Sequence, residues 1–227
     1  MTKAVSRDTS YWWTAREIEA RLGCSSCVFP RDRLLQAGDI ADIRRVGITR
    51  VEMFCGDRLP LPPGNLDIHN QAHISEVMSE CEKQGVSIVS VHSPKGYPYH
   101  SEDEDERKHA VAEGVSTAIL AEEMGAGVMV CHFGTSPQSE KSVTEMLDQL
   151  EGHSIKLGTE NGEDLADYTA IVDRIASDRF GIVVDIGHTK DEDGVNPFIK
   201  KERARETMNQ CGKRLIHVQL HDWIDGD

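Results

Sequence analysis

The residues of this chain that could do chemistry lie where short apolar segments end. Phe180–Asp185 (FGIVVD) is apolar on both faces, which is typical of a buried parallel strand, and His188 follows three residues after its terminal carboxylate. Three earlier apolar segments end at His92, His132 and Glu160. One histidine on such a segment is usually a core residue. Imidazole and carboxylate groups that converge in a dry pocket, however, are the ligands that divalent metals take, so the pattern predicts a metal site.

A regular alternation of strands and helices must position these residues. The sequence predicts strands over 23–29, 48–54, 86–92, 128–132, 154–160, 180–185 and 214–220. It predicts helices over 31–46, 73–84, 101–124, 139–150, 163–176 and 197–211. This βα alternation indicates a parallel sheet, and no glycine-rich dinucleotide turn follows the first strand. We therefore predict an α/β fold of the (β/α)8 TIM-barrel type, in which the carboxyl ends of the strands meet at one mouth.

The last predicted strand adds three polar residues to this mouth. His217, Gln219 and His221 occupy alternate positions, so we expect their side chains to point the same way. TIM barrels typically take about 250 residues, and this chain ends just after its seventh strand, so we expect the eighth βα unit to be absent. Either the chain is a fragment, or a short helix over 14–22 or a partner covers the gap. The unpaired strand edges favour association, for example as a homo-oligomer.

Length and charge limit the class of protein. The 227 residues suit one sizeable domain, which we place at 23–227 behind an N-terminal extension of residues 1–22. The net charge of -14 and the pI of about 5.1 repel nucleic acid and anionic membranes, so we expect neither as a partner. The N-terminus lacks the apolar core of a signal peptide, and we expect a cytoplasmic protein that acts on a small molecule.

Six cysteines are present, and we expect no disulfide framework. Cys24 and Cys27 have the CxxC spacing, but no second pair follows at zinc-finger distance. We therefore interpret this pair as structural.

Several short motifs carry a resemblance to known proteins. In chain order they are GITRVE (47–52), SVHSP (90–94), GAGVMVCH (125–132), TEN (159–161), VDIGH (184–188) and IHVQLHD (216–222). Their order and spacing resemble the xylose isomerase-like TIM-barrel superfamily. That superfamily unites sugar and sugar-phosphate isomerases and epimerases with abasic-site nucleases of the endonuclease IV type.

The resemblance implies a divalent metal ion (Mn, Mg, Co or Zn) and chemistry through an enediolate. Glu160 and Asp185 would be metal ligands. Gln219 would be a third ligand through its amide oxygen, at a position where many members have a histidine. Glu160 and His188 would be the catalytic residues that move a proton beside the carbonyl of a carbohydrate-like substrate. The second glutamate that the epimerases use has no candidate in this chain.

The resemblance also implies substrate contacts for a wider set of side chains. These are His92, His132, His188, His221 and Glu52. In the nuclease branch, His92 and His132 would instead be zinc ligands and His188 would bind a second metal. Glu52 would alternatively support the metal ligands without binding the ion, and burial beside an arginine would explain it equally well.

Three alternatives to a sugar isomerase or epimerase stay open. A related dehydratase acting on a polyol or keto acid would use the same metal and enolate chemistry. A zinc nuclease fits the histidines, but Gln219 and the net charge disfavour it. A non-catalytic barrel that binds a sugar or a partner fits the absence of the eighth strand.

Overall fold

The strands of this chain form one open parallel sheet. The computed structural model describes residues 14–29, 33–56, 65–162, 164–190 and 194–220. The strands are β1 (Cys24–Ser25), β2 (Arg50–Gly56), β3 (Asn65–Asp67), β4 (Ser87–His92), β5 (Val128–Cys131), β6 (Lys156–Glu160), β7 (Phe180–Asp185) and β8 (Leu215–Gln219). Their order is β1-β2-β4-β5-β6-β7-β8, with β3 paired to β2 beside this path. Every pairing is parallel, so the carboxyl ends of all strands lie on the same rim.

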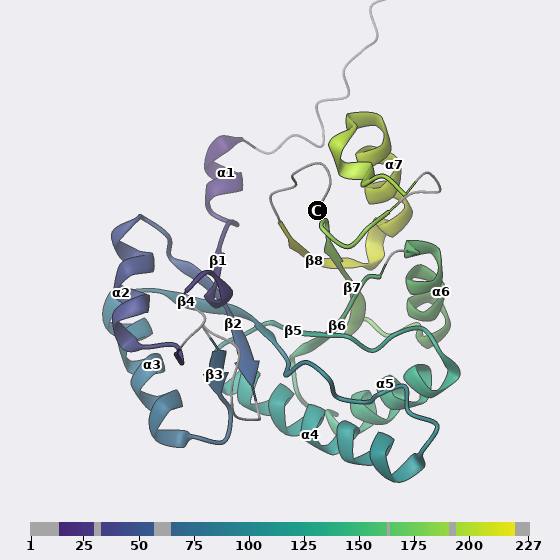
Figure 1. Ribbon diagram of the computed structural model, residues 1–227, viewed down its shortest axis with the longest axis horizontal. Coiled ribbons are helices and arrows are strands. Elements are labelled where there is room, and N and C mark those ends of the chain that lie inside the picture. Colours follow the sequence, from purple (N-terminus) through teal and green to yellow (C-terminus); the bar gives the residue numbers. More distant parts are fainter. Residues whose placement is uncertain (1–13, 30–32, 57–64, 163, 191–193, 221–227) are drawn as a thin grey trace, which may run out of the picture.

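Helices cover the outer face of the sheet (Figure 1). They are α1 (Ala15–Glu19), α2 (Ala37–Arg45), α3 (Gln71–Gln84), α4 (Glu104–Glu123), α5 (Pro137–Gln149), α6 (Leu165–Ile175) and α7 (Lys201–Cys211). Apart from α1, their buried apolar side chains join those of the strands in one core, with Ile40 and Met146 from helices and Met129 and Leu157 from strands. This burial is the main force that holds the helices on the sheet.

The parallel order and the outer helices confirm the predicted α/β fold of the TIM-barrel type. The barrel is incomplete in the part of the chain that the structure describes, because β1 and β8 form its two edges. Helix α1 does not take the place of an eighth strand. It buries none of its residues, and its Ile18 is 43% exposed.

Local hydrogen bonds explain where several helices begin. The carboxylate of Asp103 accepts the backbone N–H groups of Asp105 and Glu106 at the start of α4, so the acidic run there acts as a helix cap. Ser136 caps α5 in the same way, with Pro137 as the first helical residue.

Two predicted elements near the N-terminus were too long. The predicted strand 23–29 ends at Ser25, because the Ser25 hydroxyl accepts the Cys27 backbone N–H and turns the chain into a 3-10 helix at Ser26–Val28. The predicted helix 31–46 begins only at Ala37. Asp39 accepts the Gln36 backbone N–H, which fixes the start of α2 there.

Two further differences lie elsewhere in the chain. The predicted helix 197–211 is divided into a 3-10 helix at Pro197–Ile199 and α7, because Lys200 between them has an extended backbone. The short strand β3 was not predicted, since three residues give no readable periodicity.

The cysteines carry no disulfide. No disulfide joins any of the six, all of which lie in the described ranges. Across the described ranges, the helices are too short or too polar to cross a membrane.

Candidate functional site

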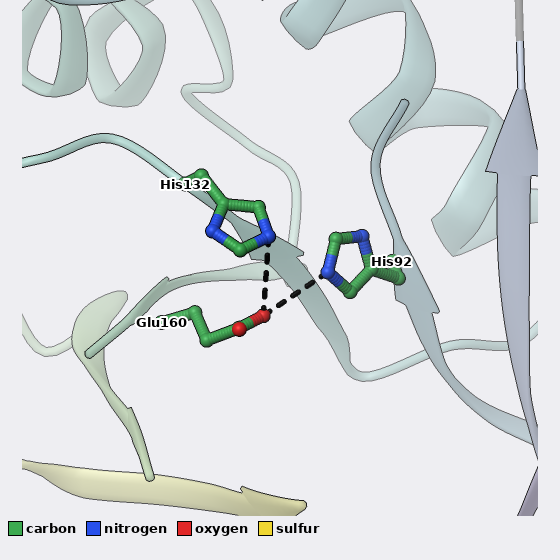
Figure 2. A group of neighbouring side chains, drawn as sticks. All are labelled: His92, His132 and Glu160. Atoms are coloured by element: carbon green, nitrogen blue, oxygen red, sulfur yellow. Dashed lines mark hydrogen bonds and ion pairs between the residues drawn. The ribbon is translucent and has the colours of Figure 1, made fainter. Parts of the chain in front are cut away.

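Glu160, the last residue of β6, is the centre of the site. Its side chain is only 2% exposed, and imidazole nitrogens from three other strand ends approach its two oxygens. His92 Nε2 lies 3.0 Å and His132 Nε2 3.4 Å from Oε2. His188 Nδ1 lies 2.8 Å from Oε1. Figure 2 shows the rings of His92 and His132 directed at the same carboxylate oxygen.

The ring of His92 is held in place from two sides. Its Nδ1 lies 2.8 Å from the Ser93 carbonyl oxygen. Phe54 of β2 stacks on the ring at 4.3 Å between centroids. Both contacts direct Nε2 toward Glu160. A histidine whose second ring nitrogen faces a carbonyl oxygen in this way is typical of metal ligands.

The turn after β7 brings His188 back to Glu160. Asn161 Oδ1 accepts the Asp185 backbone N–H at 2.7 Å, while its Nδ2 donates to Thr189 at 2.8 Å. Asp185 Oδ1 in turn accepts the Gly187 backbone N–H at 2.7 Å. These bonds join the ends of β6 and β7 and close the turn, which places His188 Nε2 3.8 Å from Asp185 Oδ2.

Burial and charge act against each other in this cluster. Burial alone would raise the pKa of Glu160, but the hydrogen bond from His92 and the positive potential of the histidines hold it below its ordinary value. Burial lowers the pKa of His132 to about 4, although the charge of Glu160 opposes this shift. At neutral pH the cluster therefore holds an ionised Glu160 and a neutral His132. The Nε2 atom of His132 is buried and has no hydrogen-bond partner among the described residues.

A second buried carboxylate, Glu52 of β2, lies two residues deeper along its strand than Phe54. It accepts hydrogen bonds from Ser90 Oγ at 2.8 Å, His217 Nε2 at 3.1 Å and Gln219 Nε2 at 2.9 Å. Burial would raise the pKa of Glu52, but the hydrogen bond and charge of His217, together with the other two donors, keep it below its ordinary value. Among the described residues, none of these partners of Glu52 is an arginine. They include a residue predicted as a metal ligand.

Two overlapping groups of side chains could hold a metal ion. One comprises His92, His132 and Glu160, and the other Glu160, Asp185 and His188; in each, the ligand atoms lie within 4.8 Å of one another. Gln219 pairs in register with Asp185 on the neighbouring strand, and its Oε1 is buried without a hydrogen-bond partner in the described ranges. A buried amide oxygen without a donor fits a cation. The donors present therefore suit a divalent ion.

The structure thus brings most of the predicted site residues to one mouth. His92, His132, Glu160, Asp185 and His188 lie together there. Glu52 and Gln219 are bonded to each other. The predicted contact His221 lies outside the described residues.

Two supporting residues, Ser90 and Asn161, had not been predicted as part of the site, and His217 was expected at the mouth but without a role of its own. Ser90 and His217 bind Glu52, and Asn161 joins β6 to β7. Alternation along β4 was the available signal for Ser90, because Ser90 precedes His92 by two residues, which places both on one face.

Comparison with known proteins agrees with this geometry. A family model described as xylose isomerase-like TIM barrel matches residues 40–227. None of the curated protein sequences compared with the chain matches it. Among solved structures, a D-tagatose 3-epimerase-like protein is 23% identical with a TM-score of 0.67, covering 88% of this chain and 75% of its own.

Two other solved structures share the fold. The 3-keto-D-glucoside 4-epimerase of E. coli is 16% identical with a TM-score of 0.64, covering 88% of this chain and 78% of its own. A xylose isomerase-like TIM barrel protein from Mycobacterium smegmatis, in complex with magnesium, is 16% identical with a TM-score of 0.54. That match covers 74% of this chain and 65% of the other. At these identities the likeness shows the fold.

Proposed function

The chain belongs to the xylose isomerase-like TIM-barrel family, and on that premise we propose that it is a metal-dependent isomerase or epimerase of a sugar or sugar phosphate. The observation that carries the proposal is the environment of Glu160. This carboxylate is buried at the mouth, is surrounded by three imidazoles and shares a potential metal-binding group with Asp185. A base held ionised in a dry, polar pocket suits removal of a proton beside a carbonyl.

Glu160, Asp185 and the amide oxygen of Gln219 would hold the metal. Two carboxylates and an amide oxygen are hard donors, which suit Mn²⁺ or Mg²⁺, while the nearby imidazoles also allow Co²⁺ or Zn²⁺. The magnesium complex of the M. smegmatis relative supports a divalent ion on this fold. When bound, the ion would supply Lewis-acid stabilisation of the enediolate.

The residues of the chain itself would bind the substrate and move the proton. Glu160 would take the proton from the carbon next to the carbonyl. His188 Nδ1, 2.8 Å from Oε1 of Glu160, is placed to hold or relay it. His92 fixes the other carboxylate oxygen through Nε2. His132, neutral and without a hydrogen-bond partner at Nε2 among the described residues, would accept a hydrogen bond from a substrate hydroxyl.

The charge of the molecule supports a small substrate. At -14, the chain would repel the phosphates of DNA, which disfavours a nuclease even though His92, His132 and Glu160 form a group that zinc could occupy. A dehydratase would use the same enolate chemistry and would differ only in the loss of water from the substrate.

Hydrogen exchange in D₂O tests the proposal. Ketopentoses, ketohexoses and their phosphates would be incubated with the chain and Mn²⁺, and deuterium would be followed by NMR. We expect deuterium at the carbon next to the carbonyl, because exchange needs only the first base and not the second glutamate of the epimerases. The exchange should vanish in Glu160→Gln and persist in Glu151→Gln, a substitution of an exposed glutamate.

Metal-loaded protein that exchanges no hydrogen in any of these sugars would contradict the proposal. Exchange accompanied by loss of water would identify the dehydratase instead.

A further inference from the structure

The carboxylate of Glu52 is a buried charge that the proposed proton transfer does not use. Its side chain is only 9% exposed. Glu52 lies on β2, next to the edge strand β1, whereas two of its three partners come from β8, the other edge strand of the open sheet. Ser90 of β4 supplies the third hydrogen bond. A buried carboxylate is costly unless its oxygens receive donors, and here both do. The three bonds fix Glu52 in one position.

This position determines the orientation of the Gln219 amide. The amide nitrogen of Gln219 donates to Glu52 Oε1 at 2.9 Å. The reversed amide would place its oxygen against a carboxylate oxygen, which is a repulsive contact of two acceptors. The negative charge of Glu52 therefore holds Nε2 toward itself and turns Oε1 away.

The oxygen of Gln219 is left without a donor as a result. It is buried and has no hydrogen-bond partner among the described residues. Asp185, with which Gln219 pairs in register, belongs to the metal-binding group of Glu160. An amide oxygen fixed in a desolvated position beside such a group is preorganised for a cation.

We propose that Glu52 is a positioning residue, which presents the amide oxygen of Gln219 to the divalent ion without touching the ion or the substrate. This inference rests on the proposed function, because it assumes that the ion binds at Glu160, Asp185 and Gln219. Ser90 and His217 would act indirectly, because their hydrogen bonds hold the carboxylate of Glu52 in place.

A double-mutant cycle on metal affinity tests this role without measuring activity. Mn²⁺ binding to the full chain would be measured by isothermal titration calorimetry for wild type, Glu52→Gln, Gln219→Ala and the double variant. We expect Glu52→Gln to weaken binding by about 10-fold or more, the usual effect of removing a residue that orients a ligand. In the Gln219→Ala background the same change should alter affinity by no more than about twofold, the scatter of independent sites.

Two controls separate this role from a structural one. Glu151→Gln removes the same charge from the surface and should leave Mn²⁺ affinity unchanged. Urea unfolding of each variant checks that it is folded. If Glu52→Gln does not fold, Ser90→Ala takes its place in the cycle, because it removes one donor from Glu52.

The outcomes distinguish the inference from its premise. Wild type that binds no Mn²⁺ would overturn the metal site, and the inference with it. The positioning role alone would be overturned if wild type binds Mn²⁺ tightly and Glu52→Gln leaves the affinity unchanged. It would also be overturned if Glu52→Gln weakens binding by the same factor in the wild-type and Gln219→Ala backgrounds.

Discussion

Glu160 shows what single residues contribute to this site. The sequence places a carboxylate or an imidazole at the end of several parallel strands, and parallel strands share one rim. This rule alone predicts that His92, His132 and Glu160 approach one another. The amide orientation of Gln219 does not, because it depends on a hydrogen bond from β8 to Glu52 on β2. Periodicity predicts the face on which a residue lies, but not the partner it meets across the barrel.

The protonation of His132 is a prediction at this scale. Burial lowers its pKa to about 4, so we expect the ring to stay neutral from neutral pH down to about pH 5 and to gain its proton only below that. Glu160→Gln removes the charge that opposes the shift and should lower the value further.

NMR titration of the ring carbons and nitrogens of the metal-free protein measures this pKa directly. A His132 ring that titrates near its ordinary value of 6.5 would contradict the environment described here.

At the scale of elements, the packing of side chains inside the sheet limits which residues a strand can carry. Gly158 lies two residues before Glu160 on β6, and a Cβ added there would come within 2.4 Å of Val183 on β7 and 3.4 Å of Val128 on β5. The strand thus needs a glycine two residues before Glu160 so that the side chains of the neighbouring strands can pack against it. The sequence predicted β6 as a strand, but not this steric demand, which depends on how the side chains of neighbouring strands interdigitate.

We therefore expect Gly158→Ala to lower the free energy of unfolding by about 1–3 kcal/mol, the usual cost of overpacking a core. Gly127→Ala is the matched control, because no atom lies within 4 Å of a Cβ built there. It should change stability by no more than about 0.5 kcal/mol. Urea denaturation of the two variants compares them, and equal stabilities would show that β7 yields to the added methyl group.

At the scale of the whole molecule, the alternation of strands and helices predicted the architecture. The spacing of apolar residues that is typical of each strand and helix can be recognised in the sequence. The short β3, the early end of β1 and the break at Lys200 were not predictable in this way. They depend on single hydrogen bonds and backbone angles rather than on a repeated pattern. Association through the open edges β1 and β8, and the sugar substrate itself, stay predictions.

The central claim is that the mouth of this sheet binds a divalent metal through Glu160. The direct measurement is elemental analysis of the full 227-residue chain after incubation with Mn²⁺, Mg²⁺, Co²⁺ or Zn²⁺ and removal of free ions, with Glu160→Ala beside it. We expect about one ion per chain, lost in the variant, because a single site with hard donors holds one divalent ion. A chain that retains no metal after incubation with excess, or that binds equally well without Glu160, would contradict it.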